Sequence, residues 1–405
     1  MNVLGVIVEY NPFHYGHLYH LDAAKKKTNA DVTVAVMSGS FLQRGEPAIT
    51  SKWTRTKMAL KGGVDLVIEL PYIYSTQKAE IFSDAAVSLL DELKVNQLCF
   101  GSESGNIDHF IHTVDVVSSR NNEIDERVRD VVKTGVSYPR AFSIAYREVF
   151  DNTNESILDL GKPNNILGYH YVKSIKKRGS KMTPCTITRE QANYHDTEVT
   201  KHQKIASATA IRKLLIENNF SIEAVEQYVP PSTLTLLRDE IHTGTHFLHW
   251  EHYFPFIRYK LLTTPTSELR AMYECEEGIE HRLIKMMKDV NSFQSFMEAV
   301  KTKRYTWTRI QRLILHILTN TSKGFMEQHC HPLSPQYIRL LGMTNKGRNY
   351  LSSIKKDLRV PLVSRASEFQ HEVLQKDIQV SQLHTLPYED ETLQQEFKSV
   401  PIQYD

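Results

Sequence analysis

Short apolar runs alternate with longer amphipathic stretches over the first 210 or so residues of this chain. Residues 3–9, 31–37, 65–70, 96–101 and 183–188 predict buried strands. The stretches between them have the apolar spacing of helices. Alternation at this spacing indicates right-handed β–α–β crossovers, and therefore an α/β fold with a Rossmann-like, doubly wound parallel sheet.

The second half of the chain has a different pattern. After about residue 240 the strand signals fade, and helical runs such as 254–264 and 306–320 dominate. We therefore expect two domains: a catalytic α/β domain over residues 1–235, followed by a mainly α-helical domain over residues 236–405.

Composition narrows the class of protein. With 405 residues and a net charge of only +2, the chain is no general polycation, so any binding of nucleic acid must come from local basic patches. The four cysteines lie far apart, which argues against a zinc site or a disulfide framework. No apolar stretch approaches membrane-spanning length, so we expect a cytoplasmic protein without a membrane partner.

A cluster of histidines follows the first predicted strand. His14, Gly16 and His17 form the pattern H-x-G-H where that strand should meet the first helix. Ligands of doubly wound sheets bind at the carboxyl ends of the strands, and helix starts favour anions. Gly16 would let the backbone approach a ligand, while the two imidazoles donate to phosphate oxygens. The motif therefore predicts a site for the phosphates of ATP.

Other interpretations of these histidines stay open. His20 lies one turn beyond His17 on the same helix face, and it is either a ligand contact or an ordinary hydrogen-bonded histidine. A metal site formed by His14, His17 and His20 is the competing functional interpretation. The motif contains no carboxylate ligand, so we favour phosphate over metal.

Several segments resemble a known family. The stretch VIVEYNPFHYGHLYHL resembles the signature of the HIGH-type nucleotidyltransferases, a superfamily that includes class I aminoacyl-tRNA synthetases and cofactor adenylyltransferases. More narrowly, the chain resembles the bacterial tRNA(Met) cytidine acetate ligase family from its first residues to beyond residue 350. The segments that carry this resemblance are 6–21, 36–60, 100–106, 161–173, 186–196, 205–215 and 304–318.

The resemblance implies an ATP site with His14 and His17 as its catalytic residues. The ATP-binding residues would be Ile7, Val8, Glu9, Tyr10, Asn11, Pro12, Phe13, His14, Gly16, His17, His20, Gly101, Asn164, Arg189, Ser207, Thr209 and Arg212. Each segment also has an ordinary structural interpretation: a turn at Gly101, helix caps at Asn164, Asn165, Ser207 and Thr209, and a surface ion pair at Arg189. The loop before residue 55 adds Gln43, Arg44, Lys52 and Arg55, which would either border an anion or form a solvated basic face.

Basic residues interleave with aromatic residues in the helical half, as in many RNA-binding surfaces. Composition alone does not separate RNA contacts from a solvated helix face, and the apolar stripe of 310–318 must be core. The resemblance implies that residues 236–405 bind tRNA. The expected RNA-binding residues are Arg304, Tyr305, Trp307, Arg309, Arg312, Lys346 and Arg348.

The resemblance implies an ATP-dependent ligase, with ATP as co-substrate and Mg²⁺ as a possible companion. Acetate would be activated as acetyl-adenylate with release of diphosphate. The acetyl group would then pass to N4 of the wobble cytidine (C34) of elongator tRNA(Met), giving N4-acetylcytidine and AMP. His195 and Asp196 are weak candidates for the base of this second step. The sequence does not indicate an oligomeric state.

Two alternatives remain at this point. A cofactor-type adenylyltransferase would use the same fold, but such enzymes commonly need only the α/β domain. A non-catalytic RNA-binding protein with a vestigial nucleotide fold would not require intact His14, Gly16, His17 and Arg212.

Overall fold

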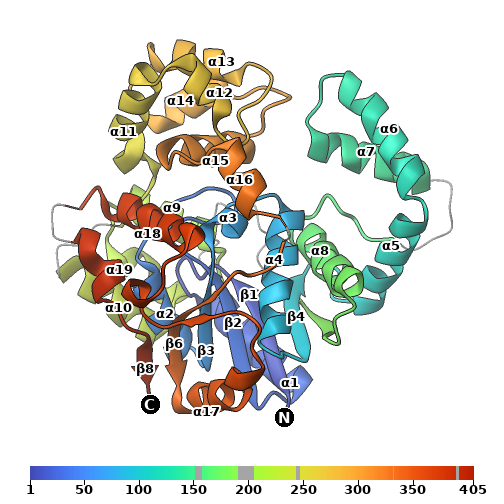
Figure 1. Ribbon diagram of the computed structural model, residues 1–405, viewed down its shortest axis with the longest axis vertical. Helices are drawn as coiled ribbons and strands as arrows, with labels where there is room; N and C mark the ends of the chain where they lie inside the picture. Colours follow the sequence, from blue (N-terminus) through green and yellow to red (C-terminus); the bar gives the residue numbers. More distant parts are fainter. Residues whose placement is uncertain (151–156, 190–204, 243–246, 332, 389–391) are drawn as a thin grey trace.

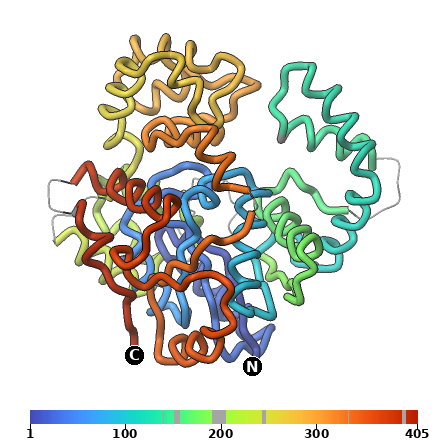
Figure 2. The backbone as a smooth tube through the Cα atoms, viewed as in Figure 1, coloured from blue at the N-terminus to red at the C-terminus, as the bar shows by residue number. Residues whose placement is uncertain are grey.

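The computed structural model describes residues 1–150, 157–189, 205–242, 247–331, 333–388 and 392–405 (Figure 2). Within them, eight strands form one sheet in the order β5-β4-β1-β2-β3-β6-β7, with β8 beside β6 (Figure 1). The strands β1 to β5 run parallel, and the bounds of the five predicted strands are confirmed to within one residue. The predicted burial is wrong for β5, which lies at the edge of the sheet with only Thr186 buried. The bounds are β1 Val3–Val8, β2 Val32–Ser38, β3 Leu66–Leu70, β4 Gln97–Ser102, β5 Thr183–Thr188, β6 Ile338–Thr344, β7 Leu362–Val363 and β8 Ile402–Tyr404.

Helices cover both faces of the sheet, as the doubly wound fold requires. Along β2, Val34 and Val36 pack into one core while Ala35 and Met37 pack into the other, and all four are fully buried. One face carries α1 (Tyr15–Thr28), α2 (Lys52–Lys61), α9 (Ala208–Glu217) and α10 (Pro231–His242); the other carries α4 (Ala79–Glu92), α5 (Ile107–Ser119) and α8 (Pro163–Arg178).

A separate group of helices lies above the carboxyl ends of the parallel strands (Figure 1). We call it the helical lobe; it comprises α11 (Trp250–Thr263), α12 (Thr266–Ala271), α13 (Ile279–Met287), α14 (Phe293–Val300), α15 (Trp307–Leu318) and α16 (Lys323–His329). The predicted apolar stripe of α15 is buried in its core, at Ile310, Leu313, Ile314 and Ile317. Helices α6 (Asn121–Lys133) and α7 (Tyr138–Phe150) pack together on the other side of the molecule.

The chain after the helical lobe differs from our expectation. Residues 236–405 do not form one helical domain, because β6 returns to the sheet antiparallel to β3, and β7 and β8 pair with β6. Its helix α17 (Asn345–Ile354) lies at the end of the sheet where the parallel strands begin, and α18 (Glu372–Thr385) lies near the opposite end, where Asp377 accepts the N–H of Tyr72 after β3. The strand pattern was hidden for two reasons. β6 carries the buried Arg339 in place of an apolar residue, and β7 and β8 have only two and three residues.

Two of the cations predicted within residues 38–55, both in the first turn of α2, are structural. Lys52 is 1% exposed and contacts Glu69 at 2.8 Å and Glu396 at 3.0 Å. Burial alone would lower the pKa of Lys52, but Glu396 and Glu69 outweigh it and raise that pKa. Arg55 is fully buried and donates to the carbonyls of Glu9 at 2.8 Å and Ser38 at 3.0 Å. Arg55 therefore fixes the ends of β1 and β2, and neither cation forms a solvated basic face.

No helix in the described part of the chain combines the length and the apolar character needed to cross a bilayer.

Candidate active site

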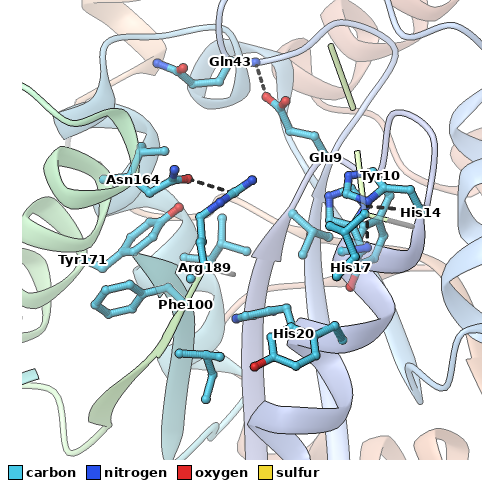
Figure 3. A pocket seen from close by; sticks show the side chains of 18 of the residues that line it. Glu9, Tyr10, His14, His17, His20, Gln43, Phe100, Asn164, Tyr171 and Arg189 are labelled. Carbon is cyan, nitrogen blue, oxygen red and sulfur yellow. Dashed lines mark hydrogen bonds between the residues drawn. The ribbon is translucent and has the colours of Figure 1, made fainter. Parts of the chain in front are cut away.

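A pocket lies at the carboxyl ends of β1, β4 and β5 (Figure 3). It holds about 1290 Å³ of space, part of it open to solvent. Eleven of the predicted ATP-binding residues line it: Ile7, Val8, Glu9, Tyr10, His14, Gly16, His17, His20, Gly101, Asn164 and Arg189. The structure therefore brings together segments that are far apart in the sequence.

The two motif histidines cap the first turn of α1. The backbone N–H of Gly16 donates to Nδ1 of His14 at 3.0 Å, and the N–H of His14 donates to Nδ1 of His17 at 3.4 Å. The rings stack with their centroids 3.8 Å apart. Because each Nδ1 accepts a hydrogen bond, each neutral ring carries its proton on Nε2. The imidazole Nε2–H groups, rather than the Gly16 amide, are thus the donors of this cap, and the His17 ring also has the Pro12 carbonyl as a hydrogen-bond partner.

The environment keeps these rings neutral. Burial lowers the pKa of His14 to about 3, and the cations Arg189 and Arg212 act in the same direction. The pKa of His17 lies well below its usual range, first through burial and then through His14 and Arg189. Burial and Arg189 lower the pKa of His20 to about 4. Neutral N–H donors suit phosphate oxygens that gain charge during a reaction.

Gly16 has a steric role in this arrangement. A Cβ at this position would lie 2.8 Å from Cε1 and 3.0 Å from Nδ1 of His14. Such contacts are too close, so any side chain at residue 16 would displace the His14 ring. The glycine of the motif is therefore required by the neighbouring imidazole itself.

The opposite wall comes from β4, β5 and the start of α8. Arg189 donates from Nη1 to Oδ1 of Asn164 at 3.2 Å (Figure 3). Both oxygens of Glu103 hold the start of α8, and Nδ2 of Asn164 lies 2.7 Å from Glu103. Asn165 instead bonds to the backbone of Ser104 and lies outside the pocket lining. His20 lies near Gly101, and its Nε2 is buried with no hydrogen-bond partner among the described residues.

Six predicted residues support the pocket without lining it. Asn11 accepts the N–H of Ile49 through Oδ1 and the guanidinium of Arg212 through its carbonyl. Arg212 also pairs with Glu46 at 2.7 Å. Ser207 caps α9 by accepting the N–H of Ala210 at 3.1 Å. The six are Asn11, Pro12, Phe13, Ser207, Thr209 and Arg212.

The pocket also contains residues that we did not assign to it. Leu167 and Tyr171 follow Asn164 at the i+3 and i+7 positions of α8, a helical spacing that could have revealed them. Phe100 and Ile187 end strands that already supply Gly101 and Arg189. The additional set is Tyr19, Phe82, Phe100, Leu167, Tyr171, Ile187, Thr188, Ile205 and Ala206; Gln43 and Arg44, which we expected to border an anion, line the pocket as well.

The predicted RNA-binding residues of the helical lobe differ in accessibility. Arg312 is 8% exposed and its Nε bonds to both carboxylate oxygens of Glu274, so it is part of the core. Tyr305 is also buried, at 8% exposed, with Arg309 lying 4.8 Å over its ring, and Trp307 is half-buried. Arg304 is exposed and pairs with Glu277 at 2.6 Å. Arg304 and Arg309 thus carry the accessible charge.

The second predicted cluster lies at the other end of the molecule. Lys346 and Arg348 are exposed on α17, which follows β6 (Figure 1). The N–H of Thr344, just before α17, donates to the carbonyl of Asp65 at 2.9 Å, at the start of β3. The cluster therefore lies at the edge where the parallel strands begin, opposite the pocket and the helical lobe.

Within the described residues, no group of three or more His, Cys, Asp or Glu side chains could hold a metal ion. His195 and Asp196, the weak candidates for a base, lie outside the described residues.

A Rossmann-like sheet with a histidine-capped helix start at its ligand-binding edge defines a nucleotidyltransferase. The model of the family described as HIGH Nucleotidyl Transferase matches residues 1–399. The tRNA(Met) cytidine acetate ligase of Bacillus subtilis (strain 168) is 48% identical over 413 residues, covering 100% of this chain and 98% of that protein. The enzyme of the same name from Bacillus licheniformis is 46% identical over 409 residues, with the same coverage.

Solved structures agree with these relatives. Crystalline Thermotoga maritima TmcAL in its apo form I superposes with a TM-score of 0.91 at 34% identity, covering 100% of this chain and 99% of that chain. The form bound with alpha-thio ATP gives 0.88 at 33% identity, with the same coverage. This chain belongs to the tRNA(Met) cytidine acetate ligase family within the HIGH nucleotidyltransferases.

Proposed function

We propose that this protein is an ATP-dependent ligase that acetylates N4 of the wobble cytidine of elongator tRNA(Met). The observation that carries the chemistry is the pair of neutral imidazoles capping α1 in the pocket. Membership of the tRNA(Met) cytidine acetate ligase family supplies the substrate. The solved relative bound with alpha-thio ATP supports ATP as the co-substrate.

In the first step, a carboxylate oxygen of acetate attacks the α-phosphorus of ATP and diphosphate leaves. The Nε2–H groups of His14 and His17 donate to the oxygens on which charge develops. Their lowered pKa values keep them neutral, so the oxygens meet fixed donors that do not lose a proton to them. Adenylation is necessary because a carboxylate oxygen is a poor leaving group, whereas AMP is a good one.

The remaining pocket residues would hold the nucleotide. Arg189 supplies a cation beside the histidines and Asn164 orients its guanidinium. His20 has an orphaned Nε2 that a ribose or base could satisfy next to Gly101. Arg212 acts from behind the motif, where it holds the Asn11 carbonyl and adds positive potential at His14.

The helical lobe would receive the tRNA. Arg304 and Arg309 are its accessible cations among the predicted residues, whereas the ring of Tyr305 is buried beneath Arg309 and supports that guanidinium. The target cytidine must leave its stack to reach the pocket, which costs least in a single-stranded anticodon loop. A tRNA substrate would place the reaction in the cytoplasm.

Purified protein given ATP and radiolabelled acetate tests this proposal. We expect label to enter unmodified tRNA(Met) transcript and no label to enter a transcript whose wobble cytidine is replaced by uridine. Labelling of both transcripts would contradict the assignment of the base. Transfer of AMP to an acceptor without acetylation of tRNA would favour the cofactor adenylyltransferase.

A further inference from the structure

One acid stands out in the pocket. Glu9 directly follows β1 and is the one carboxylic acid among the described residues that line the pocket. Its Oε1 accepts the backbone N–H of Gln43 at 2.9 Å. Within the described residues, no donor reaches Oε2. Figure 3 shows Glu9 between the histidines on one side and Asn164 and Arg189 on the other.

The surroundings of Glu9 make it a stronger base than an exposed glutamate. Burial raises its pKa above the ordinary value of 4.5, although the Gln43 N–H opposes this shift. Tyr171 lies close enough that Glu9, after burial, helps to raise the pKa of its phenol. The charged groups that face Glu9 are Glu46, which raises its pKa, and Arg212 and Arg44, which lower it, while the buried Arg55 holds its backbone carbonyl.

Glu9 lies on the side of the pocket that faces the helical lobe. The loop that carries Gln43 and Arg44 continues into Gly45, where a Cβ would lie 2.8 Å from the backbone N of Arg312 in α15. The rim beside Glu9 is thus in direct contact with the lobe proposed to receive tRNA. A base that entered the pocket at this rim would pass Gln43 and Arg44 before it met Glu9.

We propose that Glu9 is the catalytic base of acetyl transfer and the group that recognises the amino group of the target cytosine. This inference rests on the proposed function. The N4 amine of cytosine presents two N–H groups, and a carboxylate is the usual partner for them. His14 and His17 do not compete for this role, because their Nδ1 atoms already accept hydrogen bonds.

The chemistry balances in one sequence of steps. The N4 nitrogen attacks the acetyl carbonyl of acetyl-adenylate, and an N4–H proton passes to Oε2 of Glu9 as the N–C bond forms. The tetrahedral intermediate collapses, the bond between the acyl carbon and the phosphate oxygen breaks, and AMP leaves with that electron pair. Glu9 then returns its proton to solvent. The amine needs this help because its lone pair is delocalised into the ring.

Supplying synthetic acetyl-adenylate isolates this step from activation by ATP. We expect Glu9→Gln to transfer acetyl from acetyl-adenylate to tRNA(Met) transcript about 10²–10⁴-fold more slowly than the wild type in single turnovers. The wild-type rate should fall as the pH drops through the pKa of Glu9, above 4.5, and this acidic limb should be absent in Glu9→Gln. Glutamine keeps the acceptor for the Gln43 N–H, and circular dichroism checks its folding.

Two further proteins complete the experiment. Glu9→Asp retains a base at a greater distance and should be intermediate in rate, with the acidic limb preserved. His17→Ala should fail with ATP and acetate yet transfer from supplied acetyl-adenylate. Transfer by Glu9→Gln at the wild-type rate, or an unchanged acidic limb in that variant, would overturn the role of Glu9. If the wild type itself does not transfer acetyl to the wobble cytidine, the proposed function fails, and this inference fails with it.

Discussion

Two helices of this chain begin with the same pair of imidazoles, but only one of them begins in the pocket. At α1, the N–H of His14 donates to Nδ1 of His17 at 3.4 Å. At α11, the N–H of His249 donates to Nδ1 of His252 at 3.3 Å. The spacing H-x-x-H is therefore sufficient to cap a helix, and it does not by itself make a nucleotide site.

The neighbours of the two caps explain the difference. At α1 the residue before the second histidine is Gly16, and the rings stack at an interplanar angle of 29°. At α11 that residue is Glu251, and the rings meet at 69°. The carboxylate of Glu251 accepts the N–H groups of Phe293 and Gln294, so it holds the start of α14. The α1 cap instead faces cations and the ends of the parallel strands.

The largest expected effect comes from removing the second histidine of each cap. His17→Ala should lower acetate-dependent ATP–diphosphate exchange by about 10²–10³-fold, because a donor to the reacting phosphate is lost. The matched variant His252→Ala removes the same ring from α11. It should keep wild-type exchange and lose only about 1 kcal/mol of stability in denaturant unfolding.

Two outcomes for this pair of variants would contradict the proposed difference between the caps. Equal loss of exchange in both would mean that the caps act through the fold. Wild-type exchange in His17→Ala would remove the imidazole from the chemistry altogether.

A smaller effect should follow from Gly16→Ala. The added Cβ meets the His14 ring at 2.8 Å and turns its Nε2–H away, which should cost about 10²-fold in exchange. Gly324→Ala is the matched control, because Gly324 holds the same position in the first turn of α16 and its nearest atom is Ser322 Oγ at 4.0 Å. The control should leave exchange and unfolding unchanged. An equal loss in both variants would contradict the steric role of Gly16.

The parallel part of the fold was predictable because its signals are local. The strands β1 to β3 are short apolar runs, each followed by a helical pattern. The antiparallel strand β6 was not predictable, because its buried Arg339 depends on Glu396, which lies 3.9 Å away and comes from a distant part of the chain. No window of sequence contains both residues.

In the site, too, the local features were predictable from the sequence and the features that depend on distant contacts were not. His14, Gly16 and His17 are contiguous, so their chemistry could be inferred before their geometry was known. The tautomer of each ring depends on which N–H reaches it, and this requires coordinates. Sequence did not predict the surroundings of the cations in the helical half. Arg312 forms an ion pair in the core, whereas Arg348 is exposed far from the pocket.

The smallest expected effect is a pH dependence. It distinguishes the two caps because only the α1 cap lies in the pocket proposed to bind ATP. Burial lowers the pKa of His14 to about 3 and that of His249 to about 4, from an ordinary 6.5. Each folded histidine therefore binds fewer protons than its unfolded form below pH 6.5. Its contribution to stability is complete above that pH and is lost as the pH falls toward 4 or 3. Acid should therefore lower the free energy of unfolding through both caps in the same way. Nucleotide affinity should differ between them, because of the two caps only that of α1 lines the pocket. If His14 and His17 act as neutral donors, the Kd for an ATP analogue, measured by calorimetry, should change by less than about twofold between about pH 8 and about pH 6. Affinity that rises steeply as the pH falls through this range would mean that an imidazolium binds the phosphates. The histidines of the α1 cap would then be charged, not neutral, when nucleotide is bound.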